Sequence, residues 1–351
     1  MKRKRRHKKR ALVLIVEIIL LVMLAGTMFV MAKYDKFQKI AVNEEDIETN
    51  DGMKKEGYTT VALFGGDSRD GQLEAGTHAD TIMVAALNNK TKEIRLVSVY
   101  RDTLTRQADG SLKKANNAYF SGGPTEAINL LNRNFDLDVE DYVTVDFKAL
   151  ADTVDLIGGI ELSPTQEEVD CMNEYLQETA NVAGKEANFV ERAGQQTFDG
   201  VQAVTYARIR KIAGGDYKRA ERQRLVLERI FEKVKGLSIT RLNELIDTIL
   251  PSVSTSFSLT ELIGLASQAP KYQLGEMQGF PYRTVDKTMQ DTGSIVVPTG
   301  VLDNVEDLHK FLYPDENYEV SQTVQDIALE IENYTGITKD DYEEGEVILS
   351  E

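Results

Sequence analysis

Residues 58–66, YTTVALFGG, form a short run of apolar and β-branched side chains that ends in two glycines. Two similar runs follow at residues 81–87, TIMVAAL, and at residues 94–100, IRLVSVY. Short apolar runs that end at turn or polar residues are typical of buried strands. These segments therefore predict the centre of a β-sheet, and residues 142–147 and 293–298 are candidates for further strands.

Helical patterns lie between and after these strands. A helix is expected to begin at Pro124, because proline is favoured in the first helical turn, and another is expected to end at the glycine pair 158–159. Later segments place apolar side chains on one stripe, as amphipathic helices do. These segments are residues 219–237, 241–250 and 259–269. Strands interleaved with helices predict a layered α/β fold.

The N-terminus consists of a basic arm and a long apolar run. Residues 1–10 hold eight lysines and arginines, and residues 11–32 have Glu17 as their only charged residue. At about 1.5 Å per residue, this run is long enough to cross a hydrocarbon core of about 30 Å. A dense positive arm favours the cytoplasmic side. We therefore expect a single-pass transmembrane anchor, a cytoplasmic arm and an extracellular stalk at residues 33–57. A cleaved signal peptide is the alternative, although its apolar core is usually shorter.

The composition is that of a globular, acidic protein. The chain has 351 residues, 42% of them hydrophobic, and a formal net charge of −16. A single cysteine, Cys171, excludes an intramolecular disulfide and a multi-cysteine metal site. A basic arm can indicate nucleic acid, but beside a membrane span it sets topology and contacts anionic lipid, so no nucleic-acid partner is expected. Residues 336–351 are expected to be an acidic tail.

Positive charge is concentrated in residues 206–224, YARIRKIAGGDYKRAERQR, which hold five arginines and two lysines. Arg219 and Arg222 are three residues apart at the start of a predicted helix, so they share a face. Arg208 and Arg210 lie just upstream. Guanidinium groups bind phosphate oxygens in pairs, and a convergent set of them suits a pyrophosphate. A solvated helix face with Arg–Glu pairs is the structural alternative.

Charged residues also lie at the ends of the predicted strands. Asp67 and Arg69 follow the first strand, Asp80 precedes the second, and Arg101 follows the third. Strand ends of α/β sheets are where ligands bind, and two carboxylates brought together there can hold Mg²⁺. Turn chemistry and structural ion pairs are the alternatives for each motif taken alone. Together, a carboxylate pair and several arginines suit phosphoryl transfer.

In this order, the motifs resemble those of the LytR-CpsA-Psr family. That family has a G-x-D-S-R turn, an aspartate before a DT-apolar strand, a P-R-D-T strand end, an N-x-A-Y segment and a late arginine block. The corresponding stretches here read GGDSR, ADTIMV, YRDT, NNAYFSGG and AVTYARIRKIAGGDYKRAERQR, all within residues 58–237. The resemblance implies an α/β/α layered catalytic domain with a central mixed sheet over residues 58–335, outside the cell.

The resemblance also implies an enzyme. Such phosphotransferases move a glycopolymer from a polyprenyl-pyrophosphate carrier to peptidoglycan through a phosphodiester bond, with the lipid tail in an apolar cleft and the pyrophosphate at its mouth. Asp67 and Asp80 would hold Mg²⁺ (or Mn²⁺), and both would be catalytic together with Arg101. The residues that would bind the pyrophosphate are Arg69, Arg101, Arg208, Arg210 and the pair Arg219 and Arg222.

Two residues depart from the family pattern, and two other functions stay open. His78 stands where the family has arginine, which removes a fixed charge near the phosphates, and Tyr100 stands where it has proline. One alternative function is hydrolysis of the polyprenyl pyrophosphate, in which water attacks the same phosphorus. The other is a non-catalytic wall-polymer binding or regulatory module, in which the arginines only hold an anionic polymer.

Overall fold

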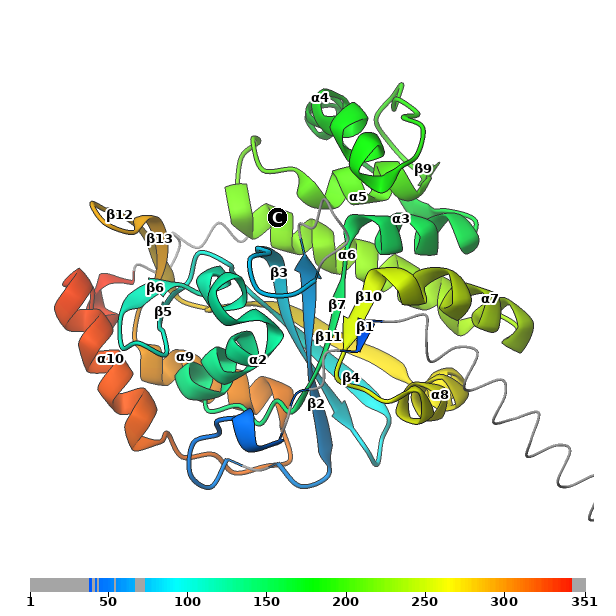
Figure 1. Cartoon of the computed structure of the whole chain (residues 1–351). Coiled ribbons are helices and arrows are strands. Elements are labelled where there is room, and N and C mark those ends of the chain that lie inside the picture. Colours follow the sequence, from blue (N-terminus) through cyan, green and yellow to red (C-terminus); the bar gives the residue numbers. More distant parts are fainter. Residues whose placement is uncertain (1–37, 40–41, 43, 54, 67–72, 343–351) are drawn as a thin grey trace, which may run out of the picture.

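The computed structural model describes residues 38–39, 42, 44–53, 55–66 and 73–342 (Figure 1). Its centre is a seven-stranded sheet in the order β1-β10-β7-β2-β3-β4-β11. These strands are β1 (Gln38–Lys39), β2 (Tyr58–Gly66), β3 (Ala79–Asn88), β4 (Glu93–Val99), β7 (Asp141–Val145), β10 (Val253–Thr255) and β11 (Gln273–Phe280). Pairing is parallel for β1–β10, β2–β7 and β4–β11 and antiparallel for the other neighbours. The predicted α/β class with a central mixed sheet is confirmed.

The two faces of β2 serve different purposes. Successive side chains of a strand point to opposite faces. Ala62 and Phe64 are buried in the main hydrophobic core. Leu63, between them, lines a cleft on the opposite face, and so does Met83 on the neighbouring strand β3. The alternation of apolar residues therefore builds a core on one side of the sheet and an apolar cleft on the other.

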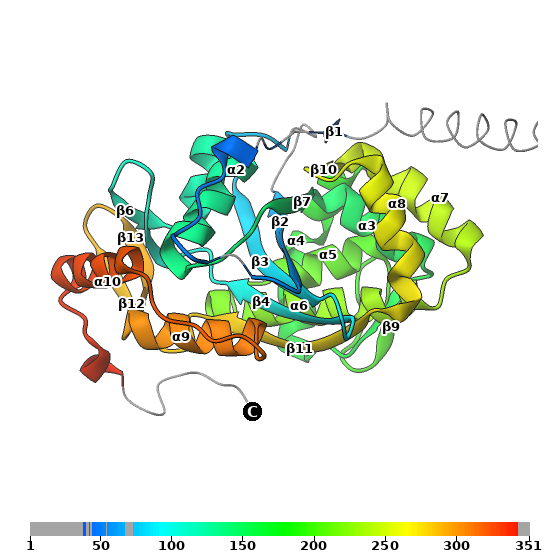
Figure 2. The same ribbon diagram turned by 90° about the horizontal axis from the view of Figure 1, so that it is seen from below.

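One layer of helices closes the main core. In Figures 1 and 2 these helices lie to one side of the central strands. They are α2 (Asn116–Phe135), α9 (Val301–Leu312) and α10 (Gln322–Thr335). Ile128 of α2, Leu308 of α9 and Ile327 of α10 are all at most 1% exposed and belong to the same cluster as Phe64. Full burial of each such side chain contributes about 1.5–3 kcal/mol to stability.

A second layer of helices covers the opposite side. It consists of α3 (Phe147–Leu156), α4 (Gln166–Ala183), α5 (Gly200–Arg208) and α6 (Gly215–Lys235). Met172 of α4, Ala203 of α5 and Val226 of α6 share a second buried cluster. At Gly200, a Cβ atom would lie 2.1 Å from the carbonyl oxygen of Ala151. Only glycine therefore allows α5 to begin this close to the backbone of α3.

The remaining elements lie around these layers. Three two-stranded sheets are formed by β5 (Leu104–Arg106) with β6 (Leu112–Lys114), by β8 (Ile160–Leu162) with β9 (Gln196–Phe198), and by β12 (Thr284–Met289) with β13 (Gly293–Pro298). Two further helices are α7 (Ile239–Ile249) and α8 (Leu259–Gln268). Short 3₁₀ turns are η1 (Glu44–Asp46), η2 (Leu250–Ser252), η3 (Ala269–Lys271) and η4 (Lys339–Asp341). A bridge from Thr103 to Val296 joins the β5 region to β13.

Helix α2 begins earlier than the sequence pattern predicts. It starts at Asn116, eight residues before Pro124, but Gly123 has a left-handed φ of 67° and interrupts the helical geometry. Pro124 therefore does begin a helical segment, as expected, but a shorter helical segment precedes it. That first segment carries the NNAY motif.

Part of the predicted stalk packs against the domain. Asn50 donates a hydrogen bond from Nδ2 to the Asp136 carboxylate at 2.5 Å, and the Glu48 amide donates to Asn129 Oδ1 at 2.9 Å. Lys55 is 9% exposed. The packed structure therefore begins before the predicted boundary at Tyr58. At the other end, Ile337 packs against the main core, inside the segment that we expected to be a tail.

The predicted membrane anchor, residues 11–32, lies outside the described residues. Within the part of the chain that the structure describes, no helix combines the length and apolar character needed to cross a membrane.

Candidate active site

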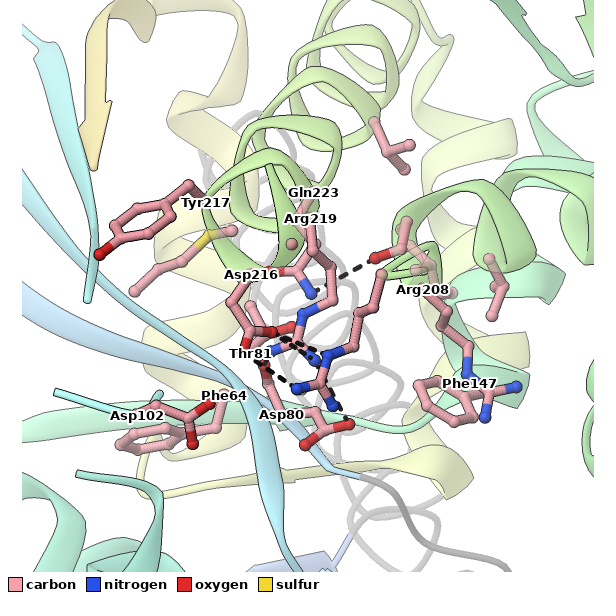
Figure 3. Close-up of a pocket in the computed structure, with 18 of the residues that line it drawn as sticks. Phe64, Asp80, Thr81, Asp102, Phe147, Arg208, Asp216, Tyr217, Arg219 and Gln223 are labelled. Carbon is pink, nitrogen blue, oxygen red and sulfur yellow. Dashed lines mark hydrogen bonds and ion pairs between the residues drawn. The ribbon is translucent and has the colours of Figure 1, made fainter. Parts of the chain in front are cut away.

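A cleft of about 970 Å³ separates the sheet from the second helical layer (Figure 3). Strand residues such as Leu63, Met83 and Val143 form one apolar wall, and Leu150 and Leu227 contribute to the helical wall. Charged residues of both signs also line this cleft; they are Asp80, Asp102, Asp146, Glu178, Arg208, Arg210, Lys211, Asp216, Arg219 and Asp286. The volume lies at the upper end of the range for small-molecule sites.

Arg101, two residues after β4, lies among three carboxylates. Its Nη1 donates a hydrogen bond to Asp80 Oδ1 at 2.5 Å, and its Nε lies 3.6 Å from Asp102 Oδ2 and 3.7 Å from Asp216 Oδ1. Strands β3 and β4 are antiparallel, with Ile82 opposite Val99, so the start of β3 meets the end of β4. Burial opposes the charge of Arg101, but the carboxylates outweigh it and raise the pKa, so this guanidinium stays charged.

Arg219, on the first turns of α6, is the most buried cation of the site at 4% exposure. Its Nη2 donates to the backbone carbonyl of Asp80 at 2.9 Å, and its Nη1 lies 3.3 Å from Asp216 Oδ1. Burial lowers the pKa of Arg219 to about 10, so it is still protonated at neutral pH. Figure 3 shows the side chains of Asp80, Asp216 and Arg219 close together.

The two buried arginines keep unused donors. Among the described residues, the Nε atoms of Arg101 and Arg219 are buried without a hydrogen-bond partner. Buried donors are almost always satisfied in folded proteins, by protein, water or ligand. Arg219 lines the cleft and Arg101 lies beside it against Asp80, so an anion bound between them would meet two fixed cations with unused donors.

Asp102 and Asp216 form a carboxylate pair beside Arg101. Burial and the hydrogen bond to Asp216 raise the pKa of Asp102, whose Oδ1 lies 3.1 Å from Lys114 Nζ. Burial also acts to raise the pKa of Asp216, but the hydrogen bond from Asp102 and the nearby arginines lower it below its usual value. Asp216 is therefore the anion that anchors the arginines, and Asp102 is the more basic of the two.

Arg208 and Arg210 extend the cationic surface toward solvent. Arg208, the last residue of α5, donates to Thr179 Oγ1 at 2.8 Å, and its guanidinium lies 4.5 Å from the ring centre of Phe147. Arg210 Nε lies 3.0 Å from Asp216 Oδ1. Gly214 has a φ of 86°, a conformation that glycine adopts without strain, and it precedes α6 directly. The N-terminal end of α6 therefore lines the cleft, and its dipole favours an anion there.

The structure brings together Asp80, Arg101, Arg208, Arg210 and Arg219 of the predicted site. Asp67 and Arg69 lie outside the described residues. The sequence analysis did not select Asp102 or Asp216, although both stand in its quoted motifs, YRDT and GGDYKR. Their positions in the sequence could have revealed them, because Asp102 directly follows Arg101 and Asp216 directly follows the glycine pair 214–215.

Arg222 lies apart from this cluster. Its Nε donates a hydrogen bond to Glu168 Oε1 at 2.7 Å, and both side chains are buried between α4 and α6. Glu168 also accepts a hydrogen bond from the Thr165 amide in the capping box of α4. Arg222 does not line the cleft. Its ion pair joins two helices, so Arg222 has a structural role, although the pair is buried and does not lie on the solvated helix face of the structural alternative.

The two departures from the family pattern take part in aromatic contacts. The His78 ring stacks on Phe120 at 4.5 Å, and the Tyr100 ring makes an edge contact with Tyr217 at 4.7 Å. Tyr100 approaches β11 so closely that a Cβ atom at Gly279 would lie 2.1 Å from the Tyr100 hydroxyl. Tyr100 therefore packs in a space that Gly279 leaves free.

The fold and the site define an α/β protein with a largely apolar cleft that has a cluster of arginines and carboxylates at one end. The model of the LytR_cpsA_psr family matches residues 26–310, and the chain belongs to this family.

Curated relatives support the predicted enzyme class. The TagU protein of Enterococcus faecalis is 29% identical over 232 residues, which cover 64% of this chain and 71% of the relative. TagU of Bacillus subtilis is 27% identical over 282 residues, covering 76% and 85%. Both carry the name polyisoprenyl-teichoic acid–peptidoglycan teichoic acid transferase. The prediction of an enzyme of the transferase type is thereby confirmed for the family to which this chain belongs.

Solved structures share the fold. A Streptococcus agalactiae protein superimposes with a TM-score of 0.65 and 21% identity over 78% of this chain and 95% of the other. TagT of Bacillus subtilis, solved with a bound octaprenyl pyrophosphate lipid, has a TM-score of 0.56 and 19% identity over 76% and 96%. TagT bound to LI-WTA has a TM-score of 0.60 and 20% identity over 76% and 96%. At these identities, the likeness establishes the fold.

The buried pair of Arg222 and Glu168 leads to a prediction about stability. Arg222→Met should lower the free energy of unfolding by about 3–5 kcal/mol, because it leaves Glu168 buried without its partner. The double variant Arg222→Met/Glu168→Met should recover much of this loss, since both charges are removed. Urea unfolding measures both. Arg208→Met, which removes a more exposed arginine, is the control. An Arg222→Met variant that unfolds at the wild-type urea concentration would contradict the structural role.

Proposed function

We propose that this protein is an extracytoplasmic phosphotransferase that moves a glycopolymer from a polyprenyl-pyrophosphate carrier to peptidoglycan through a phosphodiester bond. The observation that carries the proposal is an apolar cleft with two arginines at one end, Arg219 in its lining and Arg101 beside it, whose buried Nε atoms lack hydrogen-bond partners among the described residues. A hydrocarbon tail with a pyrophosphate at its end matches both halves of this site. The names of the curated relatives agree with it.

In this proposal, each part of the substrate has its own environment. The polyprenyl tail lies against apolar residues such as Leu63, Leu150 and Leu227. The pyrophosphate lies at Arg101 and Arg219, where the guanidinium groups donate hydrogen bonds in fixed directions. An acceptor hydroxyl bonds to the phosphorus that carries the glycan, and polyprenyl phosphate leaves. The arginines stabilise the charge that develops on the leaving phosphate, which is the main task in phosphoryl transfer.

The proposal includes a magnesium ion, which Asp80 would bind together with Asp67 of the GGDSR motif. Within the described residues, no group of three or more His, Cys, Asp and Glu side chains is arranged to hold a metal ion. Magnesium needs only one or two carboxylates, with substrate phosphate and water as its other ligands. Asp80 would supply one such ligand through Oδ2, which lies 3.9 Å from Arg219 Nη1, since its Oδ1 is already hydrogen-bonded to Arg101. A bound ion would neutralise charge on the phosphates.

The location of the enzyme is part of the proposal as well. A single-pass anchor at residues 11–32, with residues 1–10 in the cytoplasm, would place the domain outside the cell. The site would then face the membrane, which supplies the lipid carrier, and the wall, which supplies the acceptor.

The arginines lead to a prediction that separates paired hydrogen bonding from simple positive potential. Arg101→Lys, Arg208→Lys and Arg210→Lys should each reduce glycan transfer roughly ten- to a hundred-fold, because lysine keeps the charge but loses the planar donor pair. The loss corresponds to about 1–3 kcal/mol for each contact. Transfer of a labelled lipid-linked glycan to peptidoglycan is the measurement, with thermal melting to confirm folding.

The control for these variants is Arg229→Lys on the exposed part of α6, where Arg229 pairs with Glu232. This variant should transfer at the wild-type rate. Normal transfer by all three site variants would reject the paired contacts and favour a polymer-binding module. Release of polyprenyl phosphate at one rate with and without peptidoglycan, and no labelled wall product, would favour the hydrolase.

A second prediction concerns the metal. Asp80→Asn should reduce transfer at least ten-fold while the domain stays folded, because the variant keeps the shape of the side chain and loses a charged oxygen ligand. Chelator should reduce wild-type transfer in the same way, and added Mg²⁺ or Mn²⁺ should restore it. Transfer that continues at the wild-type rate in excess chelator would remove the ion from the proposal.

A third prediction concerns topology. A reporter enzyme that is active only outside the cytoplasm, fused after Glu351, should be active in cells. Replacing the lysines and arginines of residues 2–10 with neutral residues should weaken this orientation, because the positive arm would no longer hold the N-terminus in the cytoplasm. Activity from a reporter that works only in the cytoplasm would overturn the extracellular location.

A further inference from the structure

A second hollow, of about 790 Å³, adjoins the charged cluster, and we refer to it as the polar groove. Asp80 and Asp102 line both the groove and the apolar cleft, while Arg101 faces the groove. The other walls come from different elements: the β5–β6 hairpin, the start of α2, the turn between β12 and β13 and the end of α10. In Figure 1 these elements lie on the opposite side of β3 from α3 and α5. The two hollows therefore meet at one cluster of charges.

The lining of the groove differs chemically from that of the cleft. It carries amides, hydroxyls and amines, including Asn116, Asn117, Ser111, Lys113 and Tyr334. A hydrocarbon in the groove would take hydrogen bonds to water away from these polar groups. A hydroxyl-rich molecule replaces those bonds, since each hydroxyl both donates and accepts.

An aromatic pair stands at the edge of the groove. His78 lines the groove and stacks on Phe120, whose ring remains 42% exposed although it is large and apolar. Pyranose rings have an apolar face of C–H groups that packs on aromatic rings, while their hydroxyls point sideways. The polar lining and the exposed aromatic pair together fit a saccharide.

The in-line geometry of phosphoryl transfer indicates which substrate this saccharide is. In phosphoryl transfer, the attacking and leaving oxygens lie roughly in line on opposite sides of the phosphorus. Polyprenyl phosphate is the leaving group, and its tail lies in the apolar cleft. With the phosphates at Arg101 and Arg219, the attacking hydroxyl approaches from the side away from the cleft, and the polar groove lies on that side.

We propose that the polar groove binds the acceptor, a glycan strand whose free hydroxyl attacks the phosphorus; this rests on the proposed function. The hydroxyl oxygen forms a bond to the phosphorus that carries the glycan. The bond from this phosphorus to the bridging oxygen breaks, and its electron pair leaves with polyprenyl phosphate. The proton of the hydroxyl passes to the carboxylate pair of Asp102 and Asp216, which share one proton and can take up a second; Asp102 lines both hollows and lies beside Lys114.

The test uses two variants that alter the groove without touching the charged cluster. Asn117→Trp fills the groove from the first turn of α2, and Phe120→Ala removes the exposed ring. The full-length protein in detergent is assayed with a labelled lipid-linked disaccharide and with uncross-linked peptidoglycan glycan strands at varied concentration. Each variant should raise the KM for the glycan strand at least ten-fold. The KM for the lipid donor should stay within two-fold of wild type.

Direct binding provides a readout that does not depend on transfer. Titration calorimetry with soluble glycan-strand fragments should show binding to the wild type and at least ten-fold weaker binding to Asn117→Trp. Gln325→Trp, on an exposed turn of α10 away from the groove, is the matched control and should bind like the wild type. Thermal melting checks that each variant is folded.

Three results would overturn the acceptor assignment. A rise in the donor KM with an unchanged strand KM would place the donor glycan in the groove. Unchanged values of both would leave the groove without a part in the reaction. A wild type that binds no strand fragments would reject the site directly. A different result would contradict the proposed function and not the acceptor site. In that case the wild-type protein binds the glycan strand but transfers no labelled glycan to it.

Discussion

Two buried guanidinium groups, Arg101 and Arg219, hold three parts of the chain in one place. They connect Asp80 at the start of β3, the end of β4 and Asp216 at the start of α6. Burial of an ion costs several kcal/mol unless partners compensate it. The carboxylates and one backbone carbonyl supply that compensation, but the two Nε atoms have no hydrogen-bond partner among the described residues. The resulting site is stable enough to keep its geometry and still incomplete enough to bind an anion.

The same interaction explains how an acidic protein can bind an acidic ligand. The chain carries a formal net charge of −16, which would repel a pyrophosphate at close range. The charges beyond about 10 Å are largely screened at moderate salt, so the local balance decides. Arg208, Arg210 and Arg219 line the cleft and Arg101 lies beside it, and the anionic Asp216 pairs with Arg101, Arg210 and Arg219. Positive charge is therefore supplied where the ligand binds, while the remaining surface stays acidic.

The elements that could be predicted from the sequence are those whose formation depends on local patterns of apolar residues. The three central strands and α6 were predicted because their apolar residues follow the expected periods. Helix α4 was missed although its capping box, Thr165 to Glu168, was a usable signal. Strand β11, QLGEMQGF, has a weak apolar pattern and becomes a strand through its parallel pairing with β4. The partner of Arg222 lies 54 residues away in Glu168, and no local spacing reveals such a pair.

The four arginines of the site differ in exposure, and this difference gives them different roles in binding. Side-chain exposure rises from 5% for Arg219 to 14% for Arg101, 25% for Arg208 and 43% for Arg210. The two most buried groups are fixed by several partners, so they offer donors in set directions with little ordering cost on binding. The more exposed groups extend into solvent, where their charge attracts an approaching phosphate before contact. The exposed Arg208 and Arg210 therefore attract the phosphate, and the more buried Arg219 and Arg101 fix its position. Arg101 is held in place because it lies two residues after the end of β4.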